Sequence, residues 1–352
     1  MPEAGRGLSY PFAEPPAPGV PFTVAPGIEW LRVPLPFALN HINLWLIKDG
    51  PDVTIVDCGI VDAPTRALWQ SLFDGPLAGR RVSKVIVTHC HPDHIGNAAW
   101  LCDRFGVFLH IAQAEYLTAH AAADQRGGHT DQAALDLFLA HGLDPQLLDG
   151  MRDARGGGYR RLVPELPTRY HRIEAGGTVQ IDGEAWELLG GQGHAPEHIL
   201  LHRRSDRTLI SGDMVLPRIS TNVSVHAPQP DADPLGEFLR SIDTYRTLHP
   251  ATLVLPSHGL PFYGLHHRID ELAAHHAERL AELWDACAQP RTAAELMPVL
   301  FRRPLDGHQI WFAMGETLAH LNRLVVVGRL RQIGMRFVRV EADSQQDAPG
   351  RA

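Results

Sequence analysis

The pattern of apolar and polar residues changes its period several times along the 352-residue chain. Short apolar runs bounded by proline, glycine or aspartate predict β-strands, and apolar residues three or four positions apart predict helices. Up to residue 111 the two kinds of element alternate, which is typical of a sheet covered by helices. The expected strands cover 28–33, 42–47, 53–56, 84–87 and 107–111, and the expected helices cover 63–73 and 93–102.

The pattern becomes helical from about residue 112 to residue 166, and we interpret this stretch as an insertion over the edge of the sheet. Its expected helices cover 115–123 and 132–141. The strand pattern resumes at 179–181, 186–189, 199–202, 208–211 and 252–255, with a helix over 235–248. These stretches together predict one large domain over residues 28–264.

The remainder of the chain, residues 265–345, predicts three helices over 269–283, 292–301 and 310–324, and then a strand over 336–340. This order resembles a winged-helix appendage. A plain dimerisation or lid element explains the same pattern, and we prefer it to DNA binding because the third helix carries few basic residues. The apolar character of these helices makes a homodimer plausible.

Composition narrows the class of protein. The apolar fraction of 44% and the charged fraction of 20% are ordinary for a folded protein, whereas residues 1–27 hold seven prolines and predict an extended arm. The net charge of −8, without a block of Lys or Arg, disfavours nucleic acid as the main partner. Four cysteines without CxxC spacing indicate reduced thiols in the cytoplasm. We expect no membrane span and no signal peptide.

The segment from Thr88 to His94 carries the most specific chemistry. It contains three histidines and one aspartate, namely His89, His91, Asp93 and His94, and it follows an apolar strand. Imidazole is the commonest protein ligand for zinc, and carboxylates also bind divalent metals. Side chains two positions apart on an extended segment point the same way, and Asp93 and His94 come after a proline that ends the strand. We interpret this segment as part of a metal site.

Three further candidate ligands each follow an expected strand and each lie beside glycine. They are His194, Asp213 and His258. Functional residues on short loops at strand ends are held by a rigid sheet, and neighbouring glycines let the backbone pass close to an ion.

This series of residues resembles the metallo-β-lactamase-fold hydrolases, and the segment from Val56 to Gly59 resembles the Asp-x-Gly turn of that family. The resemblance implies an α/β fold, namely a four-layer αβ/βα sandwich with the site on one edge, followed here by the helical, winged-helix-like appendage. Aspartate at position 213 is typical of the glyoxalase II-like, lactonase-like and ribonuclease-like branches. The segment after His194 departs from the common family pattern at Glu197.

The resemblance also implies two metal ions and assigns their ligands. His89, His91 and His194 would bind the first ion, Asp93, His94 and His258 would bind the second, and Asp213 would bridge both. Asp57 would orient a ligand imidazole. We expect His198 to support the ligands from behind, and Asn222 and His226 to contact substrate.

The resulting hypothesis is hydrolysis of a small acyl compound, such as a thioester or lactone, by a hydroxide that bridges two metal ions. Asp93 and Asp213 would hold the hydroxide in place. Zinc is the expected metal, although the same ligands suit iron or manganese. The alternatives are phosphodiester hydrolysis of RNA on the same site and mono-iron sulfur dioxygenase chemistry.

Overall fold

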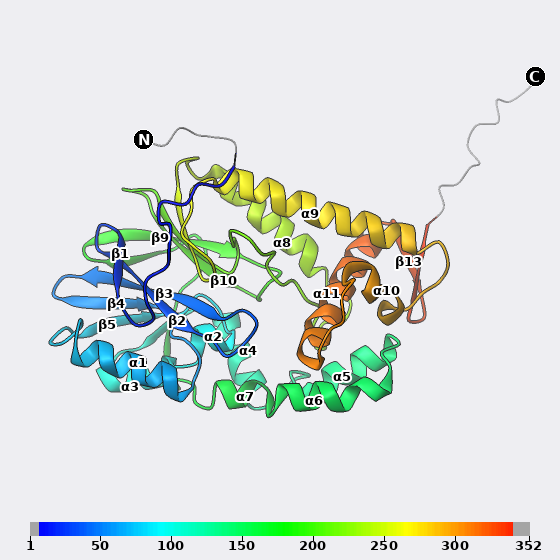
Figure 1. Cartoon of the computed structure of the whole chain (residues 1–352), viewed down its shortest axis with the longest axis horizontal. Helices are drawn as coiled ribbons and strands as arrows, with labels where there is room; N and C mark the ends of the chain where they lie inside the picture. Colours follow the sequence, from blue (N-terminus) through cyan, green and yellow to red (C-terminus); the bar gives the residue numbers. More distant parts are fainter. Residues whose placement is uncertain (1–6, 341–352) are drawn as a thin grey trace, which may run out of the picture.

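Two β-sheets pack face to face, and helices cover their outer faces (Figure 1). The computed structural model describes residues 7–340, so residues 1–6 of the expected arm and 341–345 of the expected C-terminal region lie outside the described residues. Trp30 and Trp45 of one sheet and Trp186 of the other are buried in the core between the sheets. The four-layer α/β sandwich that the family resemblance implied is therefore confirmed.

The first sheet has seven strands in the order of the sequence. They are β1 (Phe22–Ala25), β2 (Ile28–Pro34), β3 (His41–Asp49), β4 (Asp52–Val56), β5 (Val82–Ile86), β6 (Leu109–Ile111) and β7 (Tyr170–Arg172). Neighbouring strands are antiparallel up to β4 and parallel from β4 to β7. Because β3 is covered on both faces, most of its residues are buried and the strand is a continuous apolar run.

The second sheet has five strands in the order β12-β11-β10-β9-β8. They are β8 (Thr178–Ile181), β9 (Glu184–Gly191), β10 (His198–Arg203), β11 (Thr208–Gly212) and β12 (Leu253–Pro256). Strands β11 and β12 are parallel, so the segments that follow them leave the sheet at the same edge.

Helices α1 (Ala63–Asp74) and α3 (Ala98–Phe105) pack on the outer face of the first sheet through Trp69, Leu72 and Leu101. Helix α8 (Pro234–Thr244) packs on the outer face of the second sheet through Phe238. Between β6 and β7 the chain forms α4 (Gln113–Ala123), α5 (Asp131–Ala140), α6 (Leu148–Arg155) and α7 (Gly158–Leu162).

The prediction of a single helix over residues 93–102 is wrong, because the chain forms two helices there, α2 (Pro92–Ile95) and then α3. A β-carbon at Gly96 would lie 2.6 Å from the Gly59 carbonyl oxygen, so another part of the backbone packs against the chain at this point. The Asn97 side chain then donates to carbonyl oxygens of that segment, including that of Ile60 at 2.6 Å. A contact with a distant loop therefore interrupts the helix.

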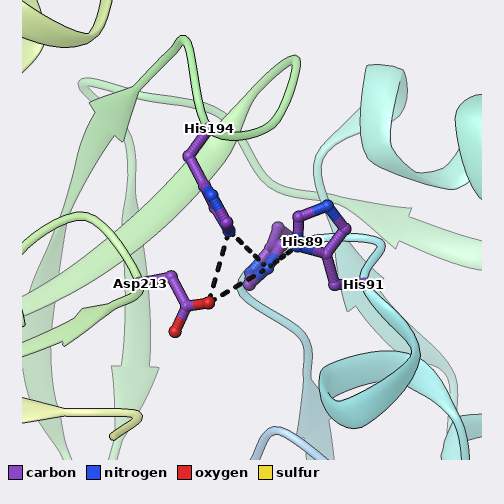
Figure 2. A group of neighbouring side chains, drawn as sticks. All are labelled: His89, His91, His194 and Asp213. Carbon is purple, nitrogen blue, oxygen red and sulfur yellow. Dashed lines mark hydrogen bonds and ion pairs between the residues drawn. The ribbon is translucent and has the colours of Figure 1, made fainter. Parts of the chain in front are cut away.

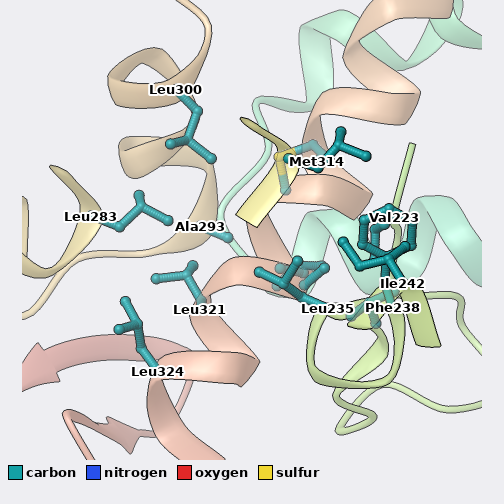
Figure 3. Packing of buried hydrophobic residues seen from close by; sticks show 14 of the residues in the cluster. Val223, Leu235, Phe238, Ile242, Leu283, Ala293, Leu300, Met314, Leu321 and Leu324 are labelled. Carbon is teal, nitrogen blue, oxygen red and sulfur yellow. The ribbon is translucent and has the colours of Figure 1, made fainter. Parts of the chain in front are cut away.

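The C-terminal region consists of α9 (Leu265–Ala286), α10 (Ala293–Leu300), α11 (Gly307–Val326), β13 (Leu330–Ile333) and β14 (Arg336–Arg339). The last two strands pair, where the sequence predicted one strand. Met314 and Leu321 of α11 share a hydrophobic cluster with Val223 and Phe238 of the sandwich (Figure 3). The C-terminal helices therefore complete a core that the sandwich also uses.

The described part of the N-terminal arm forms more hydrogen bonds than its composition predicted. Strand β1 pairs with β2, and Ser9 exchanges two backbone hydrogen bonds with Tyr263. Among the described residues, no helix is long and apolar enough to cross a membrane.

Helix α11 fits tightly against the segment that follows β11. The Val225 amide donates to the Gly315 carbonyl oxygen at 3.0 Å. A β-carbon on Gly315 would lie 2.8 Å from both Cβ and Oγ of Ser224. Glycine at this helix position therefore permits a close approach that any other side chain would prevent.

We expect Gly315→Ala to lower the free energy of unfolding by about 1–3 kcal/mol, the usual cost of overpacking, despite the better helix propensity of alanine. Combining it with Ser224→Gly removes both clashing atoms and should recover most of the loss relative to Ser224→Gly alone. Urea unfolding of the single and double variants measures this coupling. Gly150→Ala in α6 is the control, because no atom lies within 4 Å of its added carbon. Equal effects of the two alanine substitutions would contradict the close packing.

Candidate metal centre

The candidate ligands meet at the edge of the sandwich where the carboxyl ends of β5, β11 and β12 lie. His89, His91, Asp93 and His94 follow β5 of the first sheet. The remaining candidates follow strands of the second sheet: His194 lies between β9 and β10, and Asp213 and His258 follow β11 and β12. The two sheets therefore supply ligands from opposite sides of one site.

A first group of donor atoms comes from His89, His91, His194 and Asp213 (Figure 2). His89 Nε2 lies 2.9 Å from His91 Nδ1 and 3.2 Å from His194 Nε2. Asp213 Oδ2 lies 3.3 Å from His194 Nε2. The three imidazole nitrogens and this carboxylate oxygen therefore converge on one point.

A second group comes from Asp93, His94 and His258. Asp93 Oδ2 lies 3.7 Å from His94 Nε2 and 3.5 Å from His258 Nε2. The other oxygen of Asp213, Oδ1, lies 3.6 Å from His94 Nε2 and 3.4 Å from His258 Nε2. The two oxygens of Asp213 thus face different groups.

Hydrogen bonds behind the site fix the orientation of three imidazoles. His194 Nδ1 donates to the Asn222 carbonyl oxygen at 2.7 Å, and His258 Nδ1 donates to the His41 carbonyl oxygen at 2.7 Å. His94 Nδ1 lies 2.8 Å from a carboxylate oxygen of Asp57. A carbonyl oxygen can only accept, so each Nδ1 that faces one carries the proton and Nε2 keeps its lone pair toward the site.

The charge states of the imidazoles differ between the two groups of donor atoms. Burial holds the pKa of His89 and of His91 well below the usual range, and neighbouring imidazoles lower both further, so these two rings are neutral. Burial opposes ionisation of Asp213, yet the imidazoles of His258 and His94 hold its pKa well below the usual range. Burial likewise opposes a charge on these two rings, but neighbouring carboxylates, Asp213 among them, raise the pKa of both. Asp213 is therefore a carboxylate.

Two buried atoms of this site, His94 Nε2 and Asp213 Oδ1, form an ion pair at 3.6 Å but have no hydrogen-bond partner within residues 7–340. Leaving a buried donor or acceptor unpaired costs about 1–3 kcal/mol, and more for a charged group. Neutral imidazoles and carboxylates are the donors that divalent metal ions bind. The residues present therefore fit a bound divalent metal, and the two groups offer places for two ions.

Asp57 lies directly behind the site, as the sequence indicated. Its backbone has a positive φ of 62°, which is uncommon outside glycine although aspartate tolerates it. Its side chain accepts from the Thr88 amide at 2.8 Å in addition to its contact with His94. Asp57 thus connects the His94 ring to Thr88, where the loop that carries the first four candidate ligands begins.

His198 belongs to neither group of donor atoms. Its Nε2 accepts from the Asp213 amide at 3.2 Å, and its ring stacks on that of His89 at 4.7 Å. A β-carbon at Gly212 would lie 2.3 Å from this imidazole, which explains the glycine before Asp213. His198 therefore supports two candidate ligands from behind.

The expected substrate contacts lie in the segment after β11. Asn222 contributes its backbone carbonyl oxygen to His194, while its side-chain oxygen accepts from Ser224 Oγ at 2.8 Å. His226 is exposed and lies close enough to His91 to lower the pKa of that ring. The direct role of Asn222 in the structure is thus to orient His194, and a contact of either residue with substrate stays a prediction.

Two supporting residues were not identified from the sequence. Glu115 of α4 is buried, and its carboxylate accepts from the Cys90 amide at 2.9 Å and from the Glu197 amide at 2.6 Å. Glu115 therefore links, through these two hydrogen bonds, the loop that carries His91 to the loop that carries His194. His41 supports the opposite side, because its ring nitrogen accepts from the Gly259 amide at 2.8 Å.

Comparison with known proteins agrees with this geometry. The family model of the metallo-beta-lactamase superfamily matches residues 38–258, and the model of the metallo-beta-lactamase-like C-terminal domain matches residues 280–339. A solved beta-lactamase domain protein from Burkholderia ambifaria is 49% identical, with a TM-score of 0.88 and coverage of 95% of this chain and 98% of that chain.

Two curated relatives are more distant. The probable metallo-hydrolase YqjP of Bacillus subtilis (strain 168) is 25% identical over 322 residues, which cover 84% of this chain and 91% of the relative. The acyl-coenzyme A thioesterase MBLAC2 of Gallus gallus is 24% identical over 192 residues, which cover 54% of this chain and 63% of that protein. With a superfamily model matched over more than half of its length, this chain belongs to the metallo-β-lactamase superfamily and is a hydrolase of that superfamily.

Proposed function

We propose that the protein is a dinuclear metal-dependent hydrolase of acyl compounds, with a thioester or a lactone as substrate. The observation that carries the proposal is the position of Asp213, whose two carboxylate oxygens face different groups of candidate ligands. A carboxylate in that position suits a bridge between two ions. Two divalent ions bound there, most readily zinc, would acidify a water and polarise the carbonyl of the substrate.

The side chains of the site complete this mechanism. Asp93 and Asp213 accept hydrogen bonds from the attacking water and orient it toward the carbonyl carbon. The Asp93 side chain is 20% exposed and that of Asp213 is 11% exposed. Asp93 is therefore the better placed of the two to pass a proton to the departing thiol or alcohol.

Two observations support an acyl substrate, namely the net charge of the chain and the activity named for a distant relative. The net charge of −8 and the absence of a basic run disfavour a polyanionic substrate such as RNA. MBLAC2, a distant relative, is named as an acyl-coenzyme A thioesterase. Both observations favour a carbonyl compound over a phosphodiester.

The first experiment measures the metal content of the purified protein by element-resolved mass spectrometry, followed by turnover on thioesters, lactones and phosphodiesters. We expect two equivalents of metal and turnover on the acyl compounds.

Asp213→Ala should lose at least one equivalent of metal and at least about 100-fold in kcat/KM, because both metal groups lose a ligand. Asp243→Ala, on the surface of α8, is the control. Wild-type turnover and full metal content in Asp213→Ala would contradict the proposal, and one equivalent of iron would favour oxygen chemistry.

Asp57→Asn tests the orientation of His94. An amide in place of the carboxylate can donate to Nδ1, which moves the ring proton to Nε2 and turns an N–H toward the site. We expect metal affinity to fall about 10–100-fold for one of the two equivalents, measured by competition with a chelator. Asp62→Asn, at the N-cap of α1, is a matched control because asparagine caps helices as well as aspartate does. Equal metal affinity in the two variants would show that Asp57 does not control the ligand.

A further inference from the structure

Helix α11 reaches the candidate metal site through the segment that follows β11. The Val225 amide donates to the Gly315 carbonyl oxygen at 3.0 Å, the Glu316 carboxyl of the next residue lies near the Asn222 side chain, and the Asn222 carbonyl oxygen accepts from His194 Nδ1 at 2.7 Å. Asn222 thus lies between Glu316 and His194, which is a candidate ligand of the first group. This part of α11 therefore borders the site.

Three side chains of α11 lie along one face of the helix because they are four positions apart. They are His308, Phe312 and Glu316, in order toward the metal site. The rings of His308 and Phe312 are 5.0 Å apart, and Phe312 is 40% exposed although it is a large apolar side chain. On this face of α11, the Phe312 ring is about one turn from the Glu316 carboxyl, and the His308 ring is about two turns from it.

A second segment contacts these rings. Phe37, in the loop between β2 and β3, stacks on His308 with centroids 5.9 Å apart and an angle of 6°. Figure 1 shows this loop reaching toward the N-terminal end of α11. The loop leads directly into His41, whose carbonyl oxygen accepts from His258 Nδ1. Phe37, His308 and Phe312, here called the aromatic rim, therefore connect the loop that leads to His41 with the helix that packs on the segment containing Asn222.

The rim consists of two phenyl rings and one imidazole. Residues 34–40 of the loop, Pro-Leu-Pro-Phe-Ala-Leu-Asn, carry no charge, and the rim contains no lysine or arginine. Sites that bind phosphate groups depend on such basic side chains, whereas an exposed apolar surface beside a catalytic centre is typical of binding to an apolar ligand. The rim thus offers aromatic contact area without a lysine or arginine to bind an anionic group.

We propose that the acyl group of the substrate carries an apolar chain and that the aromatic rim binds this chain. The assignment rests on the proposed acyl hydrolase function and deepens it by naming the substrate class. The reacting carbonyl would lie at the two metal groups, with the chain directed outward along α11 toward Phe312 and Phe37. Each methylene that contacts the rim should raise kcat/KM by up to about fourfold, the equivalent of burying one methylene.

The test uses straight-chain acyl thioesters from acetyl to dodecanoyl that share one thiol, with the metal-loaded full-length protein. In the wild type, kcat/KM should rise with chain length and then level off. Phe312→Ala and Phe37→Ala should flatten the rise, measured as the ratio of kcat/KM for the dodecanoyl and acetyl thioesters, whereas Phe312→Leu keeps most of the apolar contact and most of the rise. Phe108→Ala, which removes an aromatic ring of similar exposure (41%) next to β6, is the matched control and should leave the rise unchanged.

Binding of the free carboxylates, from butanoate to dodecanoate, separates this inference from the proposed function. Calorimetry on the wild type should show affinity that increases with chain length and depends on Phe312. Chain-dependent binding without turnover of any thioester would support the rim and refute the proposed function. Turnover or binding whose chain dependence is the same in the wild type, Phe312→Ala and Phe37→Ala would overturn the inference while leaving the hydrolase proposal intact.

Discussion

The structure depends on holding electron-rich atoms close together in a site that is largely closed to water. Imidazole lone pairs and carboxylate oxygens repel one another, and burial removes the water that would otherwise solvate them. Several features offset this cost: carbonyl oxygens fix the tautomers of His194 and His258, and Asp57 faces His94. A bound cation would be coordinated by these closely spaced atoms. His94 Nε2 and Asp213 Oδ1, which have no hydrogen-bond partner among the described residues, therefore fit a metal.

The sequence was sufficient to predict the layered fold and to select the residues that converge at the site. The strands, helices and candidate ligands carry local signals, whereas the four-layer arrangement and the assignment of ligands to two ions were implied by the resemblance to the metallo-β-lactamase-fold hydrolases. Strands buried on both faces are continuous apolar runs, and metal ligands are restricted to a few residue types that must follow strands to reach one edge. His89 and His258 are far apart in the chain, yet each follows an apolar run and so could be placed at a strand end.

Asp57 and His198 were predicted as supporting residues, but other supporting contacts escaped prediction because they carry no local signal. Glu115 accepts from two backbone amides on loops that only the folded chain brings together. The residue that orients His194 acts through a backbone carbonyl, which any amino acid at position 222 would supply. The break between α2 and α3 likewise depends on the approach of the distant Gly59 backbone. Each of these features is a long-range contact that becomes specific only in three dimensions.

The position of α11 bears on the role of the C-terminal region. A winged-helix domain that reads DNA presents its third helix to the major groove, which requires an exposed face rich in polar and basic side chains. Here α11 buries Met314 and Leu321 in a core shared with the sandwich. Val223 belongs to that core and is adjacent in sequence to Asn222, whose carbonyl oxygen orients His194. The apolar burial that fixes the C-terminal helices therefore also fixes a candidate ligand, so the stability of this region and the geometry of the metal site are coupled.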